Sequence, residues 1–137
     1  MTQINFSVKG LIIKDHHFLA LHKSNAKNNF LDLPGGKTHM KESAEQALLR
    51  EIEEETNLIV SPKKVLSTWQ FVNDDYLIMG VLYLCDLVGG DLVLSSEHNY
   101  YEWLPLNLDS ATRLNPSLSD AICQLDFKAL WGLFFIF

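Results

Sequence analysis

The chain has 137 residues, hydrophobic residues at 47% of its positions and a formal net charge of −6 at pH 7. This length predicts one domain over residues 1–137, large enough for a real core. The acidic balance argues against a broad surface for nucleic acid or anionic lipid. It does not exclude a phosphorylated substrate, because a bound divalent cation can reverse the local charge.

The signals for cellular location are few and agree with one another. The first ten residues, MTQINFSVKG, lack the long apolar region of a signal peptide. No apolar run approaches the 18 or so residues that span a bilayer. Cys85 and Cys123 have no CxxC spacing and are predicted to be reduced core residues. We therefore expect a cytoplasmic protein without a membrane partner.

The first part of the chain predicts two strands, a glycine turn and a helix. The strands are Phe6–Ile13 and Phe18–Leu21, and a polar loop follows them at 24–29. Pro34-Gly35-Gly36 then allows backbone conformations closed to other residues. The helix is predicted over Ala44–Thr56.

The second part predicts more strands and a closing helix. The expected strands are Val65–Val72, Tyr76–Leu87, Asp91–Leu94 and Tyr101–Leu104, of which the almost wholly apolar second one suits a central strand covered on both faces. Asn115-Pro116 is a favourable helix start. Strands, a helix, more strands and a final helix indicate an α/β layer architecture.

The last eight residues, Leu130 to Phe137, form the apolar segment LWGLFFIF. Packing against the domain is one interpretation. A homodimer contact or an exposed, aggregation-prone end are the alternatives.

The predicted helix after the glycine turn has clear start and stop signals. Ser43 with Gln46 forms a capping box, and Asn57 suits a left-handed stop. At about 100° per residue, Arg50, Glu51, Glu54 and Glu55 fall within an arc of roughly 140°. Leu48 and Ile52 continue the adjacent side as an apolar stripe that anchors the helix in a core.

The charges of this helix are unfavourable for its own stability. Glu53, Glu54 and Glu55 crowd the C-terminal end, where the helix dipole disfavours each negative charge by roughly 0.3–1 kcal/mol. Glu51 and Glu55 also repel each other at i and i+4. A solvated acidic face is the ordinary interpretation of such a run. The energetic cost of clustering these glutamates instead favours a bound cation. Hard oxygen ligands indicate magnesium, manganese or calcium.

The segment from residue 36 to 58 resembles the signature of the Nudix hydrolase family. That signature requires Gly, five residues, Glu, seven residues, Arg-Glu, an aliphatic residue, any residue, Glu-Glu, any residue, Gly and an aliphatic residue. The matching positions are Gly36, Glu42, Arg50, Glu51, Ile52, Glu54, Glu55 and Leu58. Asn57 stands where the family has glycine, and asparagine is the next-best residue for a left-handed stop.

The resemblance implies a Nudix fold, an α/β/α sandwich with a mixed central β-sheet, and a divalent metal, Mg²⁺ with Mn²⁺ as an alternative. Glu54 and Glu55 would be metal ligands, helped by Glu51 and the Gly35 carbonyl. Arg50 would hold Glu51 in place. Glu42 would contact water on the metal or add to the acidic site, and Gly36 and Glu42 are both expected to lie at the substrate phosphates.

The general base that activates the attacking water stays open between two glutamates. Glu51 is one candidate, and Glu97, in a loop six residues before Trp103, is the other. Some family members carry a catalytic or metal-binding glutamate in such a loop. An ordinary surface role is the alternative for Glu97, and Glu102 is a weaker candidate.

The resemblance implies a small nucleotide-diphosphate substrate and hydrolysis of its diphosphate bond. We favour a MutT-like nucleoside triphosphate pyrophosphohydrolase. Lys37 could meet a phosphate, and Tyr76 lies near where dinucleoside polyphosphate hydrolases carry a tyrosine. The alternatives are a dinucleoside polyphosphate or nucleotide sugar hydrolase, or a non-catalytic nucleotide sensor. An isoprenoid diphosphate isomerase lacks an evident match for its catalytic cysteine.

Overall fold

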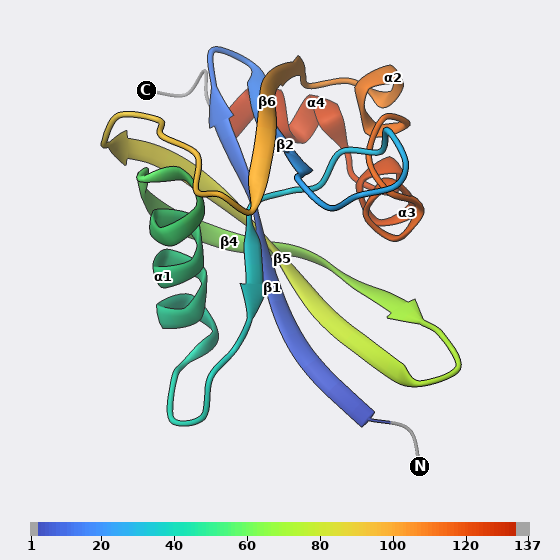
Figure 1. Cartoon of the computed structure of the whole chain (residues 1–137). Helices are drawn as coiled ribbons and strands as arrows, with labels where there is room; N and C mark the ends of the chain where they lie inside the picture. The colour runs from blue at the N-terminus through green and yellow to red at the C-terminus, as the bar shows by residue number, and fades with distance from the viewer. Residues whose placement is uncertain (1–2, 134–137) are drawn as a thin grey trace.

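The architecture is a mixed six-stranded sheet with helices on both faces, in a computed structural model that describes residues 3–133 (Figure 1). The elements in chain order are β1 Gln3–Lys14, β2 His17–Lys23, β3 Gly35–Lys37, α1 Ala44–Thr56, β4 Ile59–Val72, β5 Tyr76–Gly89, β6 His98–Pro105, α2 Leu108–Ala111, α3 Pro116–Cys123 and α4 Phe127–Leu133.

The sheet is organised around β1. Its strand order is β4-β5-β1-β2-β6, and β3 pairs with β1 off this path. β1 runs parallel to β5 and antiparallel to β2 and β3. The antiparallel β1–β3 pairing places Gly35 opposite Lys9 and Gly36 opposite Val8. This pairing brings the predicted glycine turn onto the middle of the sheet.

The alternation of side chains along β1 builds two separate cores. Val8 and Ile12 pack with Leu48 and Ile52 of α1 on one face. Leu11 and Ile13 point to the opposite face, where residues of α2, α3 and α4 complete the second core. In Figure 1, α1 accordingly lies on one side of the sheet and the three C-terminal helices on the other.

The observed elements correct several predictions. Residues 91–94 do not form the predicted strand, and β3 was not expected. The first half of β5 is only partly buried, because the β4–β5 hairpin extends beyond the helices, so this half is not covered on both faces (Figure 1). Cys85 is buried as predicted, whereas Cys123 is exposed at the end of α3; both are free.

The apolar C-terminal segment is described only in part. Leu130 in α4 is 3% exposed and belongs to the core shared with α3. This residue packs within the domain, as one of the interpretations proposed. Residues 134–137 lie outside the described part of the chain, and the homodimer stays a prediction. Among residues 3–133, no helix combines the length and apolar character needed to cross a membrane.

Candidate metal and phosphate site

The carboxylate cluster depends on the local structure of α1. The Ser43 side chain accepts from the Gln46 backbone N–H, and the Gln46 side chain accepts from the Ser43 N–H, which confirms the predicted capping box. Asn57 ends the helix in the left-handed region at φ 62°. Buried Leu48 and Ile52 fix the helix rotation. The glutamates of the last two turns are thereby held beside β3.

Glu55 is the buried member of the cluster. It is 6% exposed, and its Oε1 accepts the backbone N–H of Gly35 at 2.8 Å. Burial raises the pKa of Glu55 to about 7, although the Lys9 ammonium and the Gly35 N–H act in the opposite direction. The negative charges of Asp32 and Glu51 add to the rise in pKa.

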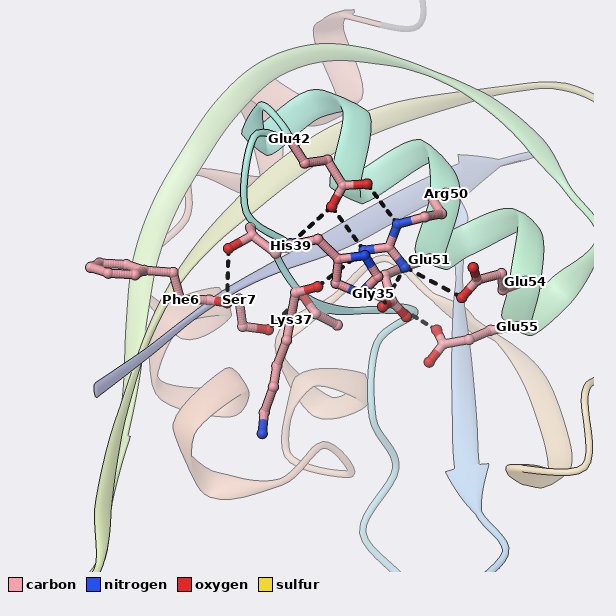
Figure 2. Close-up of polar contacts among 12 residues, drawn as sticks. Phe6, Ser7, Gly35, Lys37, His39, Glu42, Arg50, Glu51, Glu54 and Glu55 are labelled. Atoms are coloured by element: carbon pink, nitrogen blue, oxygen red, sulfur yellow. Dashed lines mark hydrogen bonds and ion pairs between the residues drawn. The ribbon is translucent and has the colours of Figure 1, made fainter. Parts of the chain in front are cut away.

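Arg50 connects three glutamates (Figure 2). Its Nε and Nη2 donate to the two Glu42 oxygens at 2.6 and 2.9 Å. Nη1 donates to Glu51 Oε1 at 2.9 Å and reaches Glu54 Oε2 at 3.4 Å. The Arg50 hydrogen bonds hold the pKa of Glu42 down at about 2, with help from the His39 N–H. Arg50 thus contacts Glu51, and its guanidinium also engages Glu42.

Gly36 provides the space that Glu51 occupies. A Cβ atom on Gly36 would lie 2.6 Å from Glu51 Oε2, closer than real contacts allow. The Gly36 carbonyl accepts from the Ser7 hydroxyl at 3.0 Å, which fixes β3 against β1. The neighbouring Gly35 has φ +139°, a conformation that favours glycine. The two glycines therefore have different roles, one in the backbone path and one beneath a carboxylate.

A buried ion-pair group under the site was missed by the sequence analysis. Lys9 Nζ lies 3.2 Å from Asp32 Oδ2 and 3.4 Å from the Gly35 carbonyl oxygen. Lys23 Nζ reaches the same Asp32 oxygen at 3.5 Å. These cations hold the pKa of Asp32 low in spite of its burial. A lysine inside the apolar run of β1 was the one available signal.

The segment 91–95 fastens the loop before β6 to the end of α1. The Val93 N–H donates to the Thr56 carbonyl and the Ser95 N–H to the Glu55 carbonyl, each at 3.0 Å. The Asn57 side chain donates to the Asp91 carbonyl at 2.9 Å. These bonds hold segment 91–95 against helix carbonyls that have no partner within the helix, so residues 91–94 do not form a strand.

Glu97 is brought to the helix cluster by this loop. Its carboxylate, one oxygen of Glu55 and one ring nitrogen of His98 all lie within 4.8 Å of one another. Glu97 is exposed, whereas His98 is 5% exposed. Burial lowers the pKa of His98, which favours the neutral imidazole. His98 had not been singled out from the sequence.

The other predicted site residues lie elsewhere. The exposed Lys37 side chain points away from the carboxylates, while its carbonyl accepts from Arg50 Nη2 at 3.2 Å (Figure 2). Tyr76 starts β5 opposite Gln3, whereas Gly35 pairs with Lys9 further along β1. Six residues of strand separate the two positions by roughly 20 Å. The structure does not bring Tyr76 together with the carboxylates.

Glu102, the weaker base candidate, is already paired. Its two oxygens accept from Arg113 at 2.9 and 3.1 Å, and Oε1 also accepts from the Tyr100 hydroxyl at 2.7 Å. The Arg113 hydrogen bonds lower the pKa of Glu102. Arg113 thus engages the carboxylate in a surface ion pair.

The residues at the end of α1 fit a hard divalent cation. Glu51, Glu54 and Glu55 offer carboxylate oxygens, the ligands that Mg²⁺ and Mn²⁺ favour. Burial is the main cause of the raised pKa of Glu55, and the nearby negative charges of Asp32 and Glu51 add to it. A divalent cation would supply the missing positive charge. The observed donor set thus supports the carboxylate cluster as a metal site.

Comparison with solved structures supports the same fold. The MutT protein from Methanosarcina mazei Go1 superposes with a TM-score of 0.80 at 27% identity, over 94% of this chain and 96% of that one. The E. coli ORF135 protein gives a TM-score of 0.80 at 20% identity, over 96% and 94% of the two chains. The second likeness concerns the fold alone.

Sequence comparison identifies the family. An ADP-ribose pyrophosphatase of Methanocaldococcus jannaschii is 32% identical over 104 residues, which are 74% of this chain and 62% of that protein. The Bacillus subtilis protein YtkD, provisionally named an 8-oxo-dGTP diphosphatase, is 28% identical over 107 residues, or 72% of this chain and 65% of that protein. The chain thus spans less than two thirds of either relative. The NUDIX domain family profile matches residues 2–125, and the chain therefore belongs to the Nudix hydrolase family.

Proposed function

We propose that this protein hydrolyses a diphosphate bond in a nucleoside diphosphate linked to another group, using Mg²⁺ with Mn²⁺ as an alternative. The observation that carries the proposal is that buried Glu55 accepts the Gly35 N–H, while Arg50 contacts both Glu51 and Glu54 on the same helix (Figure 2). Most solvated acidic helices do not bury a glutamate against a backbone N–H. The names of the two curated relatives support the same reaction class.

Each role in the proposed reaction is assigned to residues of this chain. Bound at these carboxylates, the metal would offset negative charge on the phosphoryl oxygens of the substrate. Arg50 orients Glu51 through the 2.9 Å contact. A carboxylate accepts the proton of the attacking water, and Glu51 and Glu97 remain the two candidates for this base.

A nucleoside triphosphate is the substrate class that we favour. Water attack at the α-phosphorus would break the bond to the bridging oxygen and give a nucleoside monophosphate and pyrophosphate. An oxidised nucleotide belongs to this class, in line with the provisional name of YtkD. The favoured function is therefore that of a MutT-like pyrophosphohydrolase.

ADP-ribose hydrolysis is the second candidate, because the Methanocaldococcus jannaschii relative has this activity in its name. Its products would be AMP and ribose 5-phosphate, with no pyrophosphate. Asn73, fifteen residues past Leu58, stands where many ADP-ribose hydrolases carry a proline. This departure makes the nucleoside triphosphate the first choice.

The test is a nucleotide panel with Mg²⁺ in which phosphate, pyrophosphate and nucleoside monophosphate are measured separately. E54Q and E55Q should each lower kcat/KM by about 100-fold or more on any substrate found. E53Q is the matched control, because Glu53 is exposed on the same helix. Wild-type rates in E54Q and E55Q would overturn the metal-site assignment, and a sensor would turn over no nucleotide while still binding one.

A further inference from the structure

A mixed group of ligand atoms lies beside the helix carboxylates. One oxygen each from Glu55 and Glu97 and one ring nitrogen of His98 are mutually within 4.8 Å. The three residues come from two segments, the last turn of α1 and the start of β6 with its preceding residue. Such spacing is short enough for three groups to share one cation.

His98 is the part of this group that points to a ligand. Its side chain is buried, at 5% exposure for the residue, and Nδ1 has no hydrogen-bond partner among the described residues. A buried ring nitrogen that makes no hydrogen bond is unfavourable and uncommon. The backbone of His98 is fixed, since its N–H donates to Ser95 and the residue pairs with Lys23 of β2. The imidazole is thus held in place without a protein partner for Nδ1.

An open cavity of about 480 Å³ adjoins Glu97 and His98. Its lining residues are Lys23, Ser24, Asn25, Ser96, Glu97 and His98. The two segments that form it are joined, because the Ser24 N–H donates to the Glu97 carbonyl and the Ser24 hydroxyl to the Ser96 carbonyl. The cavity can therefore supply water or substrate oxygens as further ligands while its protein groups stay in position.

The nearby lysines are compatible with a cation here. Lys9 and Lys23 both contact Asp32 Oδ2, at 3.2 and 3.5 Å. Asp32 thereby offsets part of their charge. Glu55 and Glu97 contribute two further negative groups on the side of His98. The local balance of positive and negative charge is therefore compatible with a divalent ion.

We propose that His98 is a metal ligand, and that Glu55, Glu97 and His98 form a cation site that takes a first-row transition ion such as Mn²⁺ or Co²⁺ in preference to Mg²⁺. Imidazole nitrogen favours transition ions, whereas Mg²⁺ favours an all-oxygen environment. The inference rests on the proposed function through Glu55, which belongs to both groups of ligands. It adds a second cation position with a different selectivity.

The test is to add Mn²⁺ to the metal-free protein and to measure its binding by electron paramagnetic resonance. Pulsed spectra of the wild type should show coupling of Mn²⁺ to a ¹⁴N nucleus, and H98N should lose this coupling together with at least tenfold in affinity for one bound Mn²⁺. H17N is the matched control and should retain both, because His17 pairs with Pro105 at the far end of β2. E97Q should lower the affinity for the same Mn²⁺ ion, while the ¹⁴N coupling of the bound ion remains.

Two results would overturn the proposal. One is a wild-type spectrum of bound Mn²⁺ without ¹⁴N coupling, which does not depend on the folding of any variant. The other is a folded H98N that binds Mn²⁺ as the wild type does. Nucleotide hydrolysis with Mg²⁺ is measured on the same wild-type sample. Hydrolysis without ¹⁴N coupling contradicts only the His98 site, whereas ¹⁴N coupling without hydrolysis of any nucleotide contradicts only the proposed function.

Discussion

The Arg50 guanidinium and the Glu42 carboxylate form a two-point contact across the loop between β3 and α1, with N–O distances of 2.6 and 2.9 Å. Glu42 also accepts the His39 N–H at 3.0 Å. The pair therefore fixes the loop conformation as well as the direction of Arg50. This geometry makes Glu42 a positioning residue for Arg50 and, through it, for Glu51.

Replacing Arg50 with lysine should impair turnover more than folding. Lysine cannot make the planar two-point contact with Glu42 and reach Glu51 at the same time. We expect R50K to lower kcat about 10- to 100-fold on the substrate found in the nucleotide panel. Steady-state kinetics and circular dichroism measure the two effects. R50K rates within twofold of the wild type would contradict the positioning role.

Alanine at the two β3 glycines should separate activity from stability. In G36A the new Cβ meets the Glu51 carboxylate at 2.6 Å, and this flexible side chain can move aside. In G35A it meets the Val8 carbonyl oxygen, and the backbone has φ +139°. We expect G36A to fold and lose about tenfold or more in kcat, and G35A to lose stability. Thermal unfolding and kinetics of both variants test this; a stable G35A would show that β3 can shift.

Asn57 should tolerate glycine better than alanine. It has φ 62°, a conformation that costs roughly 1–2 kcal/mol in a residue with a Cβ and no local hydrogen bond. N57A also loses the side-chain bond to the Asp91 carbonyl. We expect N57A to destabilise by about 1–3 kcal/mol and N57G by less than about 1 kcal/mol. Urea denaturation gives both values, and equal losses would mean that the side-chain bond dominates.

Glu55 should make the metal-free protein less stable as pH rises. Its pKa is raised from 4.5 to about 7 in the folded chain, so between these pH values the native state keeps a proton that the unfolded state has lost. The free energy of unfolding should therefore fall from pH 4.5 to pH 7, by a total on the order of 3 kcal/mol from this group. Denaturation in a chelating buffer across this range measures the slope.

E55Q is the comparison that isolates this effect. Glutamine can still accept the Gly35 N–H through its Oε1, but it does not titrate. The E55Q profile should lack the fall contributed by Glu55, whereas E53Q should keep it because Glu55 is intact. Parallel profiles for the wild type and E55Q would contradict the raised pKa. Addition of Mg²⁺ should stabilise the wild type most at the upper end of the range.

The parts of the site that follow local rules could be predicted from the sequence. The capping box at Ser43 and the left-handed stop at Asn57 depend on neighbouring residues, and both are present. The arc of glutamates follows from helix geometry alone. Hence the helix bounds, Ala44–Thr56, agree with the prediction.

The parts that depend on tertiary contacts could not be predicted. The three residues of β3, Gly-Gly-Lys, have no strand preference and are paired only because β1 lies beside them. The predicted strand began at Val65, whereas β4 begins at Ile59. Pro62 lies at a register irregularity of this edge strand, where proline is tolerated. Lys9 and His98 lacked any spacing signal, since their partners come from distant segments.

The hydrogen bonds from segment 91–95 to the end of α1 have an electrostatic consequence. The last turn of the helix contains no basic residue, yet two amide dipoles, from Val93 and Ser95, approach its terminal carbonyls. Neutral backbone groups thereby partly compensate the negative helix end that Glu53, Glu54 and Glu55 would otherwise aggravate. A mobile cation such as a lysine side chain would compete with a bound metal for these carboxylates, whereas an amide directed at a carbonyl does not. The loop thus stabilises the helix end and leaves its carboxylates available.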